Sequence, residues 1–148
     1  MSERKVRVAI AQAEPVFLDL GGSVKKAVRL MAEAARAGAR LVAFGESWLP
    51  GYPAWLDLCE GAAYWDHAPA KRAYARLVEN SAVIPGPETD ILCAAARENA
   101  VVVVIGVHER VTGGAGHGTL YNTNLVIGSD GSILGRHRPE YTSPVKPE

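Results

Sequence analysis

A carboxylate that follows a short apolar run is the first candidate for a reactive group in this chain. Residues 41–44 read Leu-Val-Ala-Phe and lead through Gly45 into Glu46. An apolar run without polar alternation is typical of a strand buried on both faces. Two prolines and a glycine in residues 50–53 prevent a simple continuation as strand or helix. Because ligand sites of α/β sheets lie beyond the carboxyl ends of strands, Glu46 is a candidate general base, with an N-cap or salt-bridge acid as the alternative.

Aromatic side chains near Glu46 are the expected walls of a substrate pocket. Trp48 and Tyr52 follow it directly, and Trp55 belongs to an irregular, aromatic stretch over residues 54–66. Burial beside apolar rings disfavours the charged form of a carboxylic acid, which suits a general base near neutral pH. We therefore expect Glu46 to be poorly hydrated. Ordinary core packing is the alternative for each of the three rings.

A second carboxylate, Glu109, follows a second buried strand. Residues 101–107 are almost entirely β-branched and lead into His108 and Glu109. Two acids at neighbouring strand ends are compatible with a metal site, a glycosidase pair, or the base of an amide-type hydrolase with its orienting acid. The metal site is disfavoured because His108 and Glu109, being adjacent on a strand, point to opposite faces. The two cysteines, Cys59 and Cys93, form no metal or disulfide pattern, and Cys93 falls within a helix as a buried structural thiol.

The elements expected to position these residues alternate between strands and helices. A strand at 6–12, a helix capped by Ser23 and ended by Gly38, and the strand at 41–44 form one strand–helix–strand unit, which favours neighbouring strands in one sheet. The further elements expected are a helix at 68–80, a short edge strand at 82–84, a helix opening at Pro87, strands at 101–107, 121–127 and 132–137, and a hairpin turn at 128–131. The Gly-rich stretch 111–118 lacks a phosphate-binding spacing and is expected to be a loop.

The composition is that of an ordinary globular domain. The 148 residues are 48% hydrophobic and 22% charged, with 16 basic and 16 acidic side chains. This balance gives no support for a nucleic-acid or membrane-surface partner, and no apolar run is long enough to span a bilayer. We see no signal peptide and expect a cytoplasmic protein. One domain is expected over residues 1–138, followed by an irregular, proline-rich tail at 139–148.

Several of these segments, in order, resemble the nitrilase branch of the carbon–nitrogen hydrolases. The stretch Phe-Gly-Glu-Ser-Trp-Leu-Pro-Gly-Tyr-Pro at 44–53 is similar to the glutamate motif of that family. The first strand at 8–12, Gly-Val-His-Glu-Arg at 106–110, Tyr-Asn-Thr at 121–123 and Gly-Arg-His-Arg at 135–138 match further family segments. The resemblance covers nearly the whole chain. Each match is modest by itself, but the segments occur in the same order as in the family.

The resemblance implies an α/β fold that is the N-terminal part of an α-β-β-α sandwich, a mixed sheet with helices on one face. It implies a Glu base, a Lys that stabilises the intermediate and a Cys nucleophile, with no metal or organic cofactor. Glu46 matches the base, Glu109 a supporting position near the site, and Tyr121 and Asn122 residues that buttress the strand. The implied partners are a small-molecule nitrile or amide and, in the full-length family, further copies of the same chain.

The chain departs from the family after Arg138. The expected lysine position holds Pro139, Lys146 lies in the proline-rich tail and does not take over the role, and neither cysteine matches the nucleophile. We therefore expect a truncated nitrilase that is inactive alone. The alternatives are a non-catalytic half-domain that associates with full-length nitrilases, and part of an amidase or carbamoylase of the same superfamily. Half a sandwich leaves an apolar sheet face uncovered, so association or poor solubility is expected.

Overall fold

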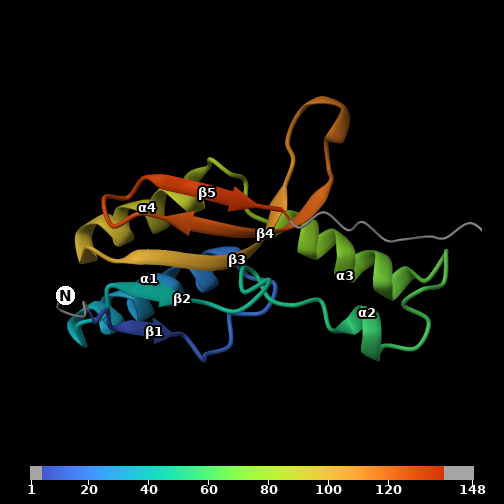
Figure 1. Ribbon diagram of the computed structural model, residues 1–148. Helices are drawn as coiled ribbons and strands as arrows, with labels where there is room; N and C mark the ends of the chain where they lie inside the picture. The colour runs from blue at the N-terminus through green and yellow to red at the C-terminus, as the bar shows by residue number, and fades with distance from the viewer. Residues whose placement is uncertain (1–4, 139–148) are drawn as a thin grey trace, which may run out of the picture.

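The computed structural model describes residues 5–138, which form a sheet with helices packed against it (Figure 1). The strands are β1 (Val8–Ile10), β2 (Leu41–Ala43), β3 (Val102–Arg110), β4 (Leu120–Ile127) and β5 (Ile133–His137). The helices are α1 (Leu20–Arg36), α2 (Trp55–Leu58), α3 (Ala68–Glu79), α4 (Pro87–Asn99) and the single 3₁₀ turn η1 (Gly114–Gly116).

The five strands lie in the sheet in the order in which they occur in the sequence, β1-β2-β3-β4-β5. β1, β2 and β3 are parallel, and β4 and β5 run antiparallel to their neighbours. α1 supplies the crossover between the first two parallel strands, as parallel pairing requires. The structure thus confirms an α/β fold with a mixed sheet.

Helix α1 begins earlier in the chain than the sequence indicated. Asp19, not Ser23, is its N-cap, and Asp19 Oδ1 accepts a 2.9 Å hydrogen bond from the Gly22 amide. The expected cap residue, Ser23, instead bonds through Oγ to both backbone groups of Val16 at 2.9 Å. The helix ends as expected, with Gly38 in a left-handed conformation at φ 83°.

The helices α1 and α4 lie on one face of the sheet and make the core with it (Figure 1). Alternate residues of β3 point to this core, and Val103, Ile105 and Val107 are fully buried there. The opposite face is open: Val8 is 58% exposed and Ile10 80% exposed. The expectation that the apolar strands are buried on both faces is therefore wrong for the described residues, because only one helical layer covers them.

Two further boundaries differ from those expected. β3 extends through Arg110, so His108 and Glu109 lie within the strand and not beyond it. The expected edge strand at 82–84 is reduced to an isolated bridge between Ala82 and Glu109. The expected tail at 139–148 lies outside the described residues, so the domain boundary at 138 stays a prediction. Within residues 5–138, the helices are all too short or too polar to cross a membrane.

Candidate active site at the carboxyl end of β2

The chain that leaves β2 turns and then runs alongside β3. The Leu49 amide donates to the Gly106 carbonyl at 3.0 Å, and the Leu49 carbonyl accepts from the His108 amide at 2.8 Å. Ser47, at the turn, has a left-handed conformation with φ 49°. These bonds fix the loop from Glu46 onward to the middle of the sheet, although the sequence gives it no regular structure.

Gly106 lets this turn lie directly on β3. A Cβ atom at position 106 would stand 2.5 Å from both the Gly45 carbonyl oxygen and the Ser47 amide nitrogen, and 2.8 Å from Glu46 Cα. Such distances are far below van der Waals contact, so any side chain there would displace the turn. The missing side chain of Gly106 therefore sets the position of the Glu46 backbone.

The Glu46 side chain is held by a neighbouring strand. Asn122, on β4, donates from Nδ2 to Glu46 Oε1 at 2.6 Å. The hydroxyl of Ser47 donates to Asn122 Oδ1 at 3.3 Å, which orients the amide so that its NH₂ group faces the carboxylate. Glu46 itself is exposed, so the expectation that it is poorly hydrated is wrong for the described residues. Its position rests on a hydrogen bond, not on burial.

A hollow of about 600 Å³ lies beside the turn, at the carboxyl ends of β1 and β2. Its wall is mostly apolar and consists of Ile10, Ala11, Gln12, Ala13, Glu14, Phe44, Gly45 and Trp48. Trp48 is buried and is anchored by a 2.7 Å hydrogen bond from Nε1 to the Ala13 carbonyl and by an edge-on contact with Phe44. The hollow is lined by Gly45, the residue before the expected base, and Glu46 itself is not among its lining residues.

The three aromatic residues expected to form one pocket lie in different places. Trp48 lines the hollow beside Glu46. Tyr52 is 53% exposed, and its hydroxyl donates to Asp57 at 3.5 Å. Trp55 lines a separate hollow of about 230 Å³ beside α3, together with Cys59 and His67. The structure brings only Trp48 to the hollow at the site.

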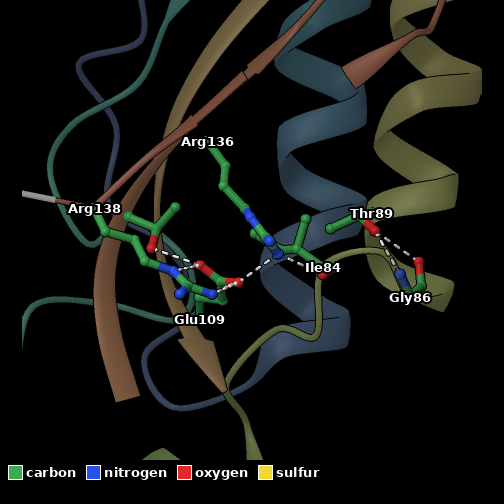
Figure 2. A network of polar contacts seen from close by, with 7 residues as sticks. Ile84, Gly86, Thr89, Glu109, Arg136 and Arg138 are labelled. Atoms are coloured by element: carbon green, nitrogen blue, oxygen red, sulfur yellow. Dashed lines mark hydrogen bonds and ion pairs between the residues drawn. The ribbon is translucent and has the colours of Figure 1, made fainter. Parts of the chain in front are cut away.

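The second acid, Glu109, is the centre of an ionic network on the helical face of the sheet (Figure 2). It is almost fully buried and accepts a 2.8 Å hydrogen bond from the Thr123 hydroxyl. Arg138 donates to both its oxygens, at 2.9 Å from Nε and 2.6 Å from Nη2, and Arg136 donates at 3.0 Å from Nη1. Arg138 also lies over the Tyr121 ring, 4.1 Å from its centroid.

This network determines the charge state of Glu109. Burial alone would raise the pKa of the carboxyl, but the hydrogen bonds from Arg138 and Thr123 and the two guanidinium charges outweigh it and hold the pKa below its ordinary value. Arg136 also bonds the Ile84 carbonyl at 2.9 Å, so the ionised carboxylate ties β5 to β3 and to the segment before α4. Its contacts are those of a structural acid.

Glu46 and Glu109 do not act as a pair. Asn122 and Thr123, which contact Glu46 and Glu109 respectively, are consecutive residues of β4 and point to opposite faces. The sheet therefore separates the two acids, although β2 and β3 are neighbours as expected. Within residues 5–138 no three potential ligands converge as a metal site would require.

Neither cysteine of the chain accompanies Glu46. Cys59 is exposed in the stretch after α2 and lines the hollow that contains Trp55. Cys93 lies in α4, in the helical layer, and burial raises the pKa of its thiol. A thiol with a raised pKa is a poor nucleophile at neutral pH, which agrees with a structural role.

Three contributors to these networks are not evident from the sequence. In the sequence, these residues appear only as parts of motifs. Nothing there indicates that Ser47 contacts Asn122, or that Arg136 and Arg138 contact Glu109. The alternation of β5 carries a signal for Arg136, because one side of that strand must face the acid on β3. No local pattern indicates the contact between Ser47 and Asn122, which joins segments 75 positions apart.

Known proteins resemble the chain over most of its length. The model of the carbon–nitrogen hydrolase family matches residues 7–140. An arylacetonitrilase of Aspergillus oryzae is 42% identical over 130 residues, which are 88% of this chain and 35% of that protein. A protein named nitrilase 2, from an unknown prokaryotic organism, is 46% identical over 138 residues, which are 90% of this chain and 40% of that protein.

The fold also matches a solved structure. An amidase from Nesterenkonia sp. superposes with a TM-score of 0.56 at 19% identity, over 90% of this chain and 42% of the amidase. At that identity the match concerns the fold alone. The chain spans well under half the length of each of these relatives. It belongs to the carbon–nitrogen hydrolase family, and within that family it resembles the nitrilases.

Proposed function

We propose that this chain supplies the general base of a nitrile-hydrolysing site, and that the base is Glu46. The observation that carries this proposal is the 2.6 Å hydrogen bond by which Asn122 holds the Glu46 carboxylate, next in the chain to Gly45 of the hollow. A general base must be held in place and still be reachable by the group that it deprotonates. Glu46 meets both needs, because one oxygen is held by Asn122 and the residue is exposed.

The reaction follows the chemistry that the family resemblance implies. Glu46 takes the proton of a cysteine thiol, the thiolate adds to the nitrile carbon, and Glu46 returns the proton to the nitrile nitrogen to give a covalent thioimidate. One water then displaces ammonia and leaves a thioester. A second water, deprotonated by the same carboxylate, releases the carboxylic acid and restores the thiol. The sum is one nitrile and two waters to one acid and one ammonia.

The other expected site residues take supporting parts in this proposal. Asn122, oriented by Ser47, aims the carboxylate. Glu109 acts at a distance, because its bonds to Thr123 and Arg138 fix β4 and the end of β5 from the helical face. Tyr121 contributes by supporting Arg138. Of the three aromatic residues, Trp48 is the proposed substrate contact that has support, from its place in the hollow, whereas the roles of Tyr52 and Trp55 stay predictions.

The 148-residue polypeptide is expected to have negligible activity by itself. Cys59 and Cys93 lie away from Glu46, and the position at which the resemblance places a lysine is Pro139, outside the described residues. Removing one member of a catalytic unit costs about as much as removing several. The test is ammonia release from aromatic and aliphatic nitriles and the matching amides. Turnover by a purified product of verified mass would refute this expectation.

The role of Glu46 is tested in a chimera. Residues 7–138 replace the matching segment of the Aspergillus oryzae arylacetonitrilase, which supplies the rest of the domain. Glu46→Gln should lower kcat/KM for the nitrile by about 10²-fold or more, the usual contribution of a general base. The matched control is Glu98→Gln, which removes an exposed carboxylate from α4 and should leave the rate unchanged. Equal rates for the two variants would refute the assignment.

The open sheet face supports a second candidate, a non-catalytic module that associates with full-length nitrilases or with itself. Val8 and Ile10 expose apolar surface that a second layer would cover in the α-β-β-α sandwich. Co-expression with a full-length nitrilase and isolation through a tag on this chain is the test. Recovery of a stoichiometric complex supports the module, and a solitary monomer counts against it.

A further inference from the structure

His108 is a buried titratable residue that the proposed chemistry leaves without a role. It is 7% exposed and lies on the same face of β3 as Gly106, on which the Glu46 turn rests. Its amide donates to the Leu49 carbonyl at 2.8 Å, so the residue lies beneath the loop that carries Glu46. Across the strands it is the direct partner of Asn122, the residue that bonds Glu46.

The ring has an unused polar atom. His108 Nε2 is buried and has no hydrogen-bond partner among the described residues. A neutral imidazole tolerates this, because an unprotonated ring nitrogen has no hydrogen to place. A proton on Nε2 would create a buried donor that has no acceptor at hydrogen-bond distance in this arrangement, which is costly unless an acceptor moves to it. The surroundings of the ring therefore suit its neutral form.

Burial of the His108 ring, and not the charges around it, favours the neutral form. Burial lowers the pKa of His108 below its ordinary value, while the Gly51 carbonyl and the negative charge of Glu46 act in the opposite direction. Arg110 lies two residues along β3, and His137 stands opposite Asn124 on β5, on the same face. From β4 the ring faces the neutral amide of Asn122. Glu46 thus provides the carboxylate whose charge acts on this ring.

We propose that His108 is a positioning residue for Glu46, an inference that rests on the proposed function. The ring is packed beneath residues 46–51 and opposite Asn122. While it is neutral, it does not compete for the Glu46 carboxylate, which stays hydrogen-bonded to the Asn122 amide. Protonation of Nε2 supplies a charged donor that competes with Asn122 for the carboxylate. At low pH Glu46 then turns from the amide toward the imidazolium, where it is paired and unavailable as a base.

Nuclear magnetic resonance of the whole 148-residue chain tests this without any turnover. The side-chain NH₂ signals of Asn122 and the ring signals of His108 are followed across pH. We expect the Asn122 signals to change with the same midpoint as the His108 ring. In His108→Gln this change should disappear, whereas it should persist in His117→Gln, which removes an exposed histidine from the loop before β4.

A second measurement does not depend on the folding of a His108 variant. Glu46→Gln removes the negative charge that favours the protonated ring, so the midpoint of the His108 titration should fall. Glu98→Gln, in the helical layer, should leave it unchanged. Asn122 signals that do not respond as His108 titrates, or an unmoved His108 midpoint in Glu46→Gln, would overturn the proposal. Neither readout requires hydrolysis. Equal rates for Glu46→Gln and Glu98→Gln in the chimera would therefore refute the proposed function and leave this coupling intact.

Discussion

Asn122 donates a 2.6 Å hydrogen bond to Glu46 across 76 positions of sequence. Glu46 stands in a loop after a three-residue strand, and Asn122 stands on β4, two strands away in the sheet. The loop reaches β4 because it runs over Gly106 of the strand between them. The orientation of the proposed base therefore depends on the packing of three separate segments.

Replacing this amide should impair the base without unfolding the chain. Asn122→Asp keeps the shape of the side chain but places a second carboxylate against Glu46. We expect kcat/KM of the nitrilase chimera to fall by roughly 10–100-fold, because a displaced reacting group loses its alignment. The free energy of unfolding should change by less than about 1 kcal/mol, since both residues are exposed.

The control for this change lies two residues along the same strand. Asn124 is exposed on the same face of β4, so Asn124→Asp adds the same charge without touching Glu46. Steady-state kinetics of the two variants should therefore differ. Similar losses in both would show that added negative charge, and not the lost amide, is responsible.

Gly106→Ala should disturb the Glu46 turn directly. The added methyl group would meet backbone atoms of residues 45–47 at 2.5–2.8 Å, which cannot be relieved by rotating a side chain. We expect a loss of about 1–3 kcal/mol in the free energy of unfolding, measured by urea denaturation. Gly135→Ala, in β5, is the matched control because a Cβ atom there would have nothing within 4 Å. If Gly106→Ala and Gly135→Ala have equal free energies of unfolding, the turn at residues 45–47 can move at no measurable cost.

The sequence predicts the elements of this fold better than their exposure. Residues 101–107 are so rich in β-branched side chains that a strand there is unambiguous, and Gly38 marks the end of α1 correctly. Burial on both faces is not predictable from such a run, because an apolar face looks the same whether or not a second layer covers it. Ile10, 80% exposed, shows this difference.

For the candidate site, the sequence singles out individual residues but not how they pair. Glu46 and Glu109 are both recognisable as acids at the ends of apolar runs. Their separation by the sheet follows from the register of β3 with β4, which places Thr123 and not Asn122 on the side of Glu109. Register depends on contacts between distant segments, so no local pattern reveals it.

Loss of the Glu109 charge should destabilise the fold at neutral pH. Breaking a buried ion pair costs roughly 3–5 kcal/mol, and the partial exposure of Arg136 and Arg138 reduces this to about 2–3 kcal/mol. Glu109→Gln should therefore lower the free energy of unfolding at pH 7 by about that amount. Glu88→Gln, which removes a carboxylate from the first turn of α4, should cost less than about 1 kcal/mol.

The contribution of Glu109 to the free energy of unfolding should depend on pH. The pKa of Glu109 is lower in the folded chain than in the unfolded chain, where a glutamate has a pKa of about 4.3. Its contribution is therefore complete above that pH and is lost as the pH falls through the lower, folded pKa. Urea denaturation between pH 7 and pH 3 should show the difference between wild type and Glu109→Gln shrinking over the acid end of this range. A difference that stays constant would mean that the carboxylate charge does not stabilise the fold.

The open sheet face should make the chain associate, and one substitution should reduce this. Ile10 is 80% exposed at the end of the edge strand β1, where a lysine adds charge without leaving a cavity. We expect light scattering after gel filtration to show a concentration-dependent oligomer for the wild type and a shift toward monomer for Ile10→Lys. Ile91→Lys replaces the same type of side chain, 51% exposed, on α4 in the helical layer, and should leave the association unchanged. A wild-type chain that stays monomeric at high concentration would show that this apolar face does not drive association, whereas an equal response to both variants would place the contact elsewhere.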